Sequence, residues 1–129
     1  MNASVVLTIV CDDRPGIVEA LSEVLQNHSG NWAESSMLSL AGKFAGILLA
    51  NLPPQQVESF LQALQGLQSE GMHIVAQRTS QQRSQGTVRE FTLDLVGQDR
   101  PGIVHDISEI LARHHVNVQE LDTECQSAS

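Results

Sequence analysis

The chain has 129 residues and a formal net charge of −8, with 41% hydrophobic and 17% charged residues, so it fits one ordinary domain or two small ones and is not intrinsically disordered. The acidic charge is shared evenly by the parts before and after residue 80, and the sequence contains three Phe, one Trp and no Tyr. Direct binding of nucleic acid is therefore not expected, because the chain lacks both phosphate-neutralising charge and base-stacking surfaces.

The cysteines and the hydropathy of the sequence argue against a disulfide-linked secreted protein and against a membrane protein. Cys11 and Cys125 form neither a disulfide framework nor a metal-ligand spacing, so we expect a cytoplasmic protein. The first residues lack the basic segment of a signal peptide. The longest uncharged apolar run, Phe44 to Leu52, has nine residues, less than half a membrane span, so we expect no membrane contact.

The first elements of the chain predict a strand, a turn and a helix. Val5 to Val10 is rich in β-formers, and the turn that follows, Asp12 to Gly16, has carboxylates able to cap the next helix. One face of that helix is apolar at helical spacing: Ile17, Val18, Leu21, Val24 and Leu25. The helix is expected to end at His28-Ser29-Gly30.

The next elements complete an α+β unit. Residues 31–40 alternate loosely, and Ala41-Gly42 turns the chain into a strand from Lys43 to Asn51, which predicts a hairpin. A second helix begins at Pro53-Pro54, and Met72 to Arg78 forms the last strand. The order β-α-β-β-α-β predicts a ferredoxin-like fold, with both helices on one face of an antiparallel sheet of order 4-1-3-2.

A six-residue segment occurs twice. Residues 13–18, Asp-Arg-Pro-Gly-Ile-Val, return 86 positions later as residues 99–104. At this offset 11 of the 20 residues from 13 to 32 are identical, and Asn31 pairs with Asn117. The sequence therefore contains a duplicated module.

The second copy of the module is only partly represented. We expect a strand from Arg89 to Val96, a helix from Pro101 to about His114 and a strand from Val116 onward. Thr79 to Thr87 contains no apolar residue and predicts a linker, so the domains are a complete first unit (1–80), a linker (81–88) and an incomplete second unit (89–129). The expectation is that the chain continues beyond Ser129 or that another chain covers the exposed core.

The two repeated turns are candidate ligand sites. A helix that follows such a turn offers free N–H groups and the positive end of its dipole, which suit a carboxylate. Gly16 and Gly102 would allow a ligand close to the backbone, and Asn31 or Asn117 could hydrogen-bond its polar groups. The plain alternative is a strand-to-helix turn and a helix-exit residue with no ligand.

Other candidate residues do not form a site. His105-Asp106 and His114-His115 have no second ligand set at tetrahedral spacing, and we interpret them as solvated helix residues. The repeated Ser-Glu pair at residues 22–23 and 108–109 has no partner base. We therefore expect no catalytic residues, no metal and no cofactor.

Together, the strand, the Asp-Arg-Pro-Gly-Ile-Val turn, the amphipathic helix and the Asn that leads into the next strand resemble the ACT domain family. That family comprises small regulatory modules that bind amino acids, usually between two copies of the module. The first unit covers the whole module and the second unit its first half. Two tandem units without another domain most resemble the group of glycine cleavage system transcriptional repressors.

The resemblance implies which residues hold a ligand: the turn backbone, the residue before Arg-Pro-Gly, and the Asn after the helix. By position these are Asp13, Arg14, Pro15, Gly16, Ile17 and Asn31, and then Asp99, Arg100, Pro101, Gly102, Ile103 and Asn117. Cys11 and Gly97 stand where some members have a polar residue. Asp13 and Asp99 would repel a ligand carboxylate but could meet its ammonium group.

The resemblance favours a non-enzymatic regulator that senses a small amino acid, possibly glycine. Without a DNA-reading element, it would act through a protein partner such as a DNA-binding transcription activator. The alternative is a ligand-free interaction or assembly module, or the detached regulatory domain of an amino-acid metabolic enzyme. We also predict at least a homodimer, with residues 89–124 docked on another subunit or on the first unit.

Overall fold

The computed structural model describes residues 2–80, 89–98 and 100–124. The chain forms two units, Met1–Gly86 and Thr87–Ser129, and each is described by itself. The predicted linker (81–88), the candidate ligand residue Asp99 and Cys125 lie outside the described residues.

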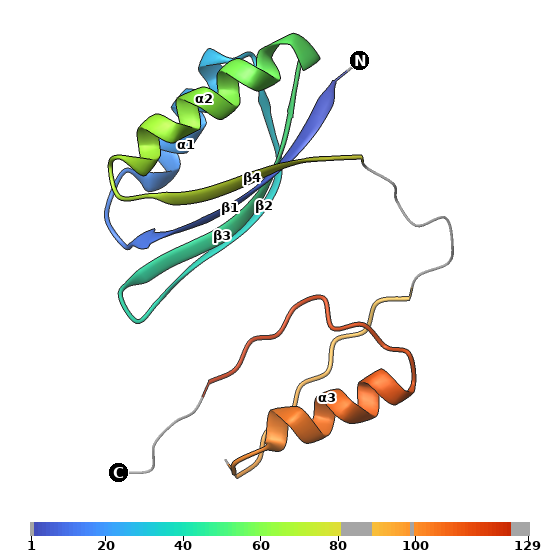
Figure 1. The fold of residues 1–129 in the computed structure, drawn as a ribbon. Helices are drawn as coiled ribbons and strands as arrows, with labels where there is room; N and C mark the ends of the chain where they lie inside the picture. The colour runs from blue at the N-terminus through green and yellow to red at the C-terminus, as the bar shows by residue number, and fades with distance from the viewer. Residues whose placement is uncertain (1, 81–88, 99, 125–129) are drawn as a thin grey trace. The chain divides into compact units, whose positions relative to one another are not determined.

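The first unit contains a four-stranded antiparallel sheet and two α-helices (Figure 1). Its elements in chain order are β1 (Ala3–Asp12), α1 (Ile17–Asn27), β2 (Asn31–Leu40), β3 (Lys43–Leu52), the 3-10 helix η1 (Pro54–Gln56), α2 (Val57–Gln68) and β4 (His73–Thr79). The strand order is β2-β3-β1-β4. The predicted ferredoxin-like fold of this unit is confirmed, although α2 begins after a short 3-10 turn rather than at the two prolines.

The hydrophobic core lies between the sheet and the helices, which cover the same sheet face (Figure 1). Alternate residues of β1 are buried there, because successive side chains of a strand point to opposite faces. The buried side chains are Val5, Leu7, Ile9, Cys11, Ile17, Leu21, Leu25, Leu48, Ala50, Leu52, Val57, Phe60, Leu64, Leu67, Met72 and Ile74. Cys11 is thus a buried residue of the core.

The β2–β3 hairpin turns at the predicted dipeptide. Ala41 and Gly42 both have positive φ, 52° and 79°, as a two-residue turn of type I′ requires. The register of β2 against β3 shifts between Trp32 and Glu34, which marks a bulge or irregularity. A shift of this kind interrupts the alternation of inward and outward side chains at that point of β2.

The second unit contains one regular element, α3 (Ile103–Arg113), within its described residues. The predicted helix is therefore present, but the predicted strands at Arg89–Val96 and from Val116 are wrong: residues 89–98 and 114–124 are not strands. A strand is defined by hydrogen bonds to a neighbour, and the described part of this unit offers none. A helix closes its own hydrogen bonds, so α3 forms without a neighbour.

Candidate functional site

The turn after β1 is tied to two other loops of the first unit. The backbone N–H of Asp13 donates to the carbonyl oxygen of Gly42, at the tip of the β2–β3 hairpin, over 3.0 Å. The guanidinium of Arg14 donates to the carbonyl oxygen of Glu70, in the α2–β4 loop, over 3.1 Å. Three chain segments therefore meet at one end of the sheet.

Helix α1 begins at this turn without a side-chain cap. Gly16 is the N-cap residue, with φ of 93°, a left-handed conformation that favours glycine. The prediction that an aspartate carboxylate caps the helix is therefore wrong. The first N–H groups of α1 keep their hydrogen-bonding capacity and the positive end of the helix dipole. A Cβ added at Gly16 would meet no atom within 4 Å. The positive φ, and not a lack of space, is therefore the reason that glycine is favoured at this position.

The carboxylate of Asp12 pairs with the Lys43 ammonium across the β1–β3 ladder instead. The hydrogen bond from Lys43 holds the pKa of Asp12 below its ordinary value, and the same bond raises the pKa of Lys43. Both side chains are largely exposed, so solvent screens this pair. Next to it, burial raises the pKa of the Cys11 thiol, and Cys11 is a protonated, unreactive thiol at neutral pH.

Asn31 lies at the opposite end of the sheet from the turn. It is exposed at the start of β2 and pairs with Asn51 of β3, whereas Asp12 pairs with Lys43 at the other end of β3. Asn51 follows Lys43 by eight positions along β3, so the two residues lie about 26 Å apart at 3.3 Å per residue. The structure therefore does not bring Asn31 to the turn residues within one unit.

The remaining turn residues of the first unit differ in access. Asp13, Arg14, Pro15 and Gly16 are exposed, whereas the side chain of Ile17 is buried in the core. Only the backbone of Ile17 is thus available to a ligand.

At Gly102 the second unit repeats the backbone conformation found at Gly16, but the contacts of its described residues differ. Gly102 is the N-cap of α3 with φ of 84°, again without a side-chain cap. The Arg100 guanidinium donates to the Asp106 carboxylate in the first turns of α3, over 3.0 Å, and not to a distant loop. Pro101 and Asn117 are exposed, Ile103 is half-buried, and Asn117 follows the helix in a segment that is not a strand.

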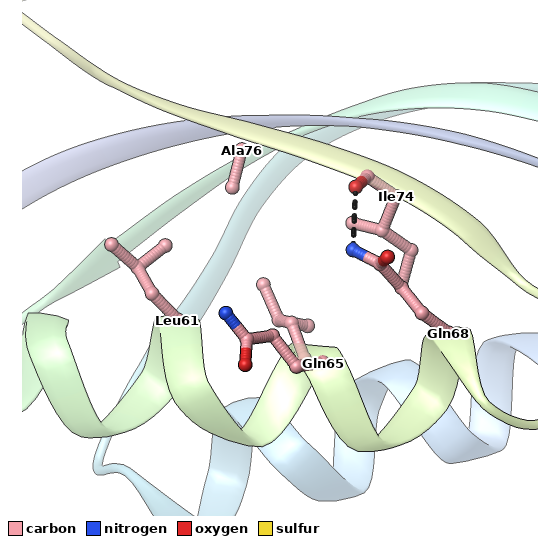
Figure 2. A pocket seen from close by; sticks show the side chains of 6 residues that line it. Leu61, Gln65, Gln68, Ile74 and Ala76 are labelled. Atoms are coloured by element: carbon pink, nitrogen blue, oxygen red, sulfur yellow. Dashed lines mark hydrogen bonds between the residues drawn. The ribbon is translucent and has the colours of Figure 1, made fainter.

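A hollow of about 200 Å³ lies between α2 and the edge strand β4. Figure 2 shows Leu61, Gln65 and Gln68 of α2 facing Ile74 and Ala76 of β4. The Gln68 side-chain amide donates to the carbonyl oxygen of Ile74 over 3.0 Å. The sequence analysis did not identify this hollow. The feature of the sequence that could have indicated it is the pair of glutamines one helical turn apart on α2.

The sheet face opposite the helices is open and partly apolar. Cross-strand register places Leu38, Ala45 and Val10 in one row and Ile47, Thr8 and Val75 in the next. The larger apolar side chains in these rows are about half exposed. A second hollow, of about 270 Å³, lies on this face beside Val6, Glu34 and Leu49. Neither hollow contains a residue predicted to bind a ligand.

Within residues 2–80, 89–98 and 100–124, no group of three or more His, Cys, Asp or Glu side chains has the arrangement of a metal site. None of the helices in these ranges has the length and apolar character needed to cross a bilayer.

Residues 3–77, which include all of the first unit from β1 almost to the end of β4, match the family model of the ACT domain. Among curated proteins, none matches the sequence significantly.

Three solved structures resemble the chain. A protein of unknown function from Galdieria sulphuraria is 28% identical, with a TM-score of 0.72 over 96% of this chain and 71% of its own. A protein assigned as a glycine cleavage system transcriptional repressor is 17% identical, with a TM-score of 0.70 over 98% and 74%. A formyltetrahydrofolate deformylase from Pseudomonas syringae pv. tomato is 27% identical, with a TM-score of 0.55 over 64% and 29%.

Proposed function

The chain belongs to the ACT domain family, a family of regulatory modules, and from this we propose that it senses a small amino acid, with glycine as the first candidate. The proposal includes no catalytic step. The sensed signal passes to a protein partner, such as a DNA-binding transcription activator in the cytoplasm.

The observation that carries the proposal is the uncapped start of α1 beside an exposed carboxylate. The first N–H groups of the helix and its positive dipole end suit a ligand carboxylate. Asp13, exposed three residues before the Gly16 N-cap, suits a ligand ammonium group. An amino acid carries both charges, so the two features together favour it over a simple anion.

The site is completed by a second copy of the unit. Strand β2 lies at the edge of the sheet, with Asn31 at one end and the hairpin tip near Asp13 at the other. Antiparallel pairing of two β2 edges about a two-fold axis would bring Asn31 of each copy toward the turn of the other. This arrangement supplies the amide that a single unit holds about 26 Å away.

The choice of glycine and of a transcriptional role is supported by one comparison. One structural neighbour is assigned as a glycine cleavage system transcriptional repressor, which makes glycine and transcription the first choices to test. The net charge of −8 disfavours contact with DNA, so the proposal requires a protein intermediary.

The proposal is tested by isothermal titration of the chain with a panel of amino acids that begins with glycine. We expect binding, and we expect Asn31→Ala to weaken it by about 1–3 kcal/mol, the effect of leaving a ligand group unpaired. Asn27→Ala, an exposed asparagine at the last turn of α1, is the matched control and should bind normally. Absence of heat from every amino acid at millimolar concentration would exclude the sensor.

A second candidate function is supported by the open sheet face. A half-exposed apolar surface formed by Val10, Leu38, Ile47 and Val75 is typical of a protein-binding surface. If no amino acid binds, this surface favours a ligand-free interaction module or a detached regulatory domain. The resemblance to part of a formyltetrahydrofolate deformylase fits the latter.

A further inference from the structure

Strand β4 forms one edge of the sheet within the described part of the chain. The hydrogen bond from the Asp13 N–H to the Gly42 carbonyl oxygen extends the β1–β3 ladder by one residue and fixes its pattern. Every second residue of an antiparallel strand bonds to a given neighbour, so the odd-numbered residues of β1 bond to β3 and the even-numbered residues bond to β4. The β4 partners of these even-numbered residues are His73, Val75, Gln77 and Thr79.

The other residues of β4, which are Ile74, Ala76 and Arg78, therefore direct their backbone N–H and carbonyl groups to the open edge. A second observation agrees with this pattern. The side-chain amide of Gln68 in α2 donates to the carbonyl oxygen of Ile74 over 3.0 Å, so this carbonyl faces away from β1. The Gln68 amide thus takes the place that the backbone N–H of an added strand would occupy.

Helix α2 forms the second wall of a groove along this edge. The hydrogen bond of Gln68 to Ile74 marks one end, and the ion pair of Glu58 with Arg78, at 3.6 Å, marks the other. Glu58 and Gln68 are ten residues apart on the helix, about 15 Å at 1.5 Å per residue. Ile74 and Arg78 are about 13 Å apart on the strand. The groove is therefore long enough for about four or five residues of an extended chain.

The hollow of about 200 Å³ lies between these two ends. Figure 2 shows the side chains of Leu61 and Gln65 of α2 on the side that faces Ala76. The hollow is larger than a cavity of roughly 150 Å³ that binds benzene, so it has room for one branched aliphatic side chain. In an added antiparallel strand, the residue opposite Ala76 would direct its side chain into this hollow and its N–H toward β4.

The groove carries no net charge. None of the six residues that line the hollow is charged, and the two charged side chains at its end, Glu58 and Arg78, have opposite signs. The chain as a whole carries a net charge of −8, so this groove is a neutral stretch of an acidic protein. An uncharged segment is complementary to it, because a charged side chain would lose water there without gaining an ion partner.

We propose that this groove binds an uncharged, extended segment of a partner protein, which adds to β4 as a further antiparallel strand. An aliphatic side chain of the segment fills the hollow, and its backbone displaces the Gln68 amide from Ile74 and bonds to Ala76. Main-chain hydrogen bonds of this kind supply affinity, and the pocket for one side chain supplies selectivity.

A different protein is favoured over a second copy of the chain at this edge. The proposed ligand site already pairs two copies through their β2 edges, which lie on the other side of the sheet. Pairing through the β4 edges as well would give each copy two separate two-fold interfaces and join the copies into an unlimited sheet. A single segment of another protein adds one strand and does not propagate. This choice of occupant rests on the proposed function, whereas strand addition itself does not.

One loop connects the groove to the proposed ligand site. The Arg14 guanidinium donates to the carbonyl oxygen of Glu70, in the loop between α2 and β4. Gln68, at one end of the groove, lies two residues before Glu70. A ligand that moves the turn at Arg14 would therefore act on the end of the groove that the partner segment must open.

Hydrogen exchange of single amides in the full chain, measured by NMR, tests whether the edge is free. The amides of Val75 and Gln77 should be protected because they bond to β1, whereas those of Ala76 and Arg78 should exchange at least about tenfold faster. Protection of Ala76 and Arg78 in the protein alone would mean that another part of the chain or a second copy occupies the edge, and it would overturn the proposal.

The binding probe is the blocked peptide acetyl-Thr-Val-Thr-Val-Thr-amide at millimolar concentration. We expect it to slow exchange at Ala76 and Arg78 by at least about tenfold. N-methylation of its first Val should abolish this protection, because that N–H faces β4, whereas N-methylation of the central Thr, whose N–H faces away, should not. Equal effects of the two methylations, or no protection by the unmodified peptide, would contradict strand addition.

Two variants of α2 test the displaced amide. Gln68→Ala should tighten peptide binding roughly three- to tenfold, because the peptide no longer competes for the Ile74 carbonyl. Gln62→Ala removes another exposed glutamine of α2, one that does not line the hollow, and should leave the affinity unchanged. Unchanged affinity in Gln68→Ala would overturn the proposed displacement. No amino acid is present in these measurements, so their failure leaves the sensor intact, and a chain that binds no amino acid can still bind the peptide.

Discussion

The guanidinium of Arg14 donates a hydrogen bond to the carbonyl oxygen of Glu70, 56 residues later in the chain. The bond joins the β1–α1 turn, where we place the ligand site, to the loop between α2 and β4. In the second unit the equivalent Arg100 bonds to Asp106 of its own helix instead. Arg14 therefore ties the turn to the loop that follows α2.

We predict that Arg14→Ala lowers the free energy of unfolding of the first unit by about 0.5–1.5 kcal/mol, the net contribution of one hydrogen bond. Backbone amides of the α2–β4 loop should exchange faster with solvent, because the loop loses this attachment. Hydrogen exchange measured by mass spectrometry checks both effects. Arg100→Ala is the matched control, and accelerated exchange around Glu70 in that variant would contradict the assignment.

Two glycine substitutions should have opposite effects on the stability of the first unit. A Cβ at Gly30 would lie 2.2 Å from Cδ1 and 3.1 Å from the carbonyl oxygen of Leu25, so Gly30→Ala should destabilise the unit by about 1–3 kcal/mol. Gly66 lies within α2 with open space beside it, so Gly66→Ala should stabilise the unit by about 0.5–1 kcal/mol. Urea unfolding followed by Trp32 fluorescence measures both. A loss of stability in Gly66→Ala would show that α2 is not a helix at that point.

The Asp12–Lys43 pair should make stability depend on pH in acid. The folded state lowers the pKa of Asp12 from its ordinary 3.8, so the unfolded state takes up the proton first. The stabilisation is therefore complete above the ordinary pKa and is lost as pH falls through the lower, folded value. Asp12→Asn should unfold at a lower temperature than the wild type near neutral pH, and the difference should disappear in strong acid.

Asp13→Asn is the control for that titration. Among the described residues its side chain makes no hydrogen bond, and the backbone N–H to Gly42 is unaffected by the substitution. The difference between Asp12→Asn and the wild type should also shrink at high salt, because both partners are exposed. A pH profile of Asp12→Asn parallel to the wild type would exclude the pair as its cause.

Local sequence patterns were sufficient to predict the strands and helices of the first unit. The run of β-formers from Val5 to Val10 predicted β1, and the Ala41-Gly42 turn predicted the hairpin. Sequence could not predict the partner of Asp12, because Lys43 reaches it only through the β1–β3 register. The strands expected after Arg89 were wrong for a related reason: their β-formers require a neighbour that lies far away in sequence or in another chain.

The candidate site was predictable only in part. The repeated Asp-Arg-Pro-Gly segment correctly indicated two helix starts, each with a glycine of positive φ. Asn31 follows α1 closely in sequence, yet the helix runs back along the sheet and carries it to the far end. Spacing along a chain reports neighbours on one element, and it does not reveal which end of the sheet a residue reaches.

The pairing of β1 with β4 has a consequence for synthesis of the chain on the ribosome. Ser4 pairs with Thr79, so one edge of the strand made first finds its partner only when the last strand of the unit is translated. At roughly 5–20 residues per second, the nascent β1 waits roughly 4–15 s with that edge unpaired. During this interval the unpaired edge of the apolar strand can pair with other chains, so slower translation before residue 79 should increase aggregation of the newly made protein.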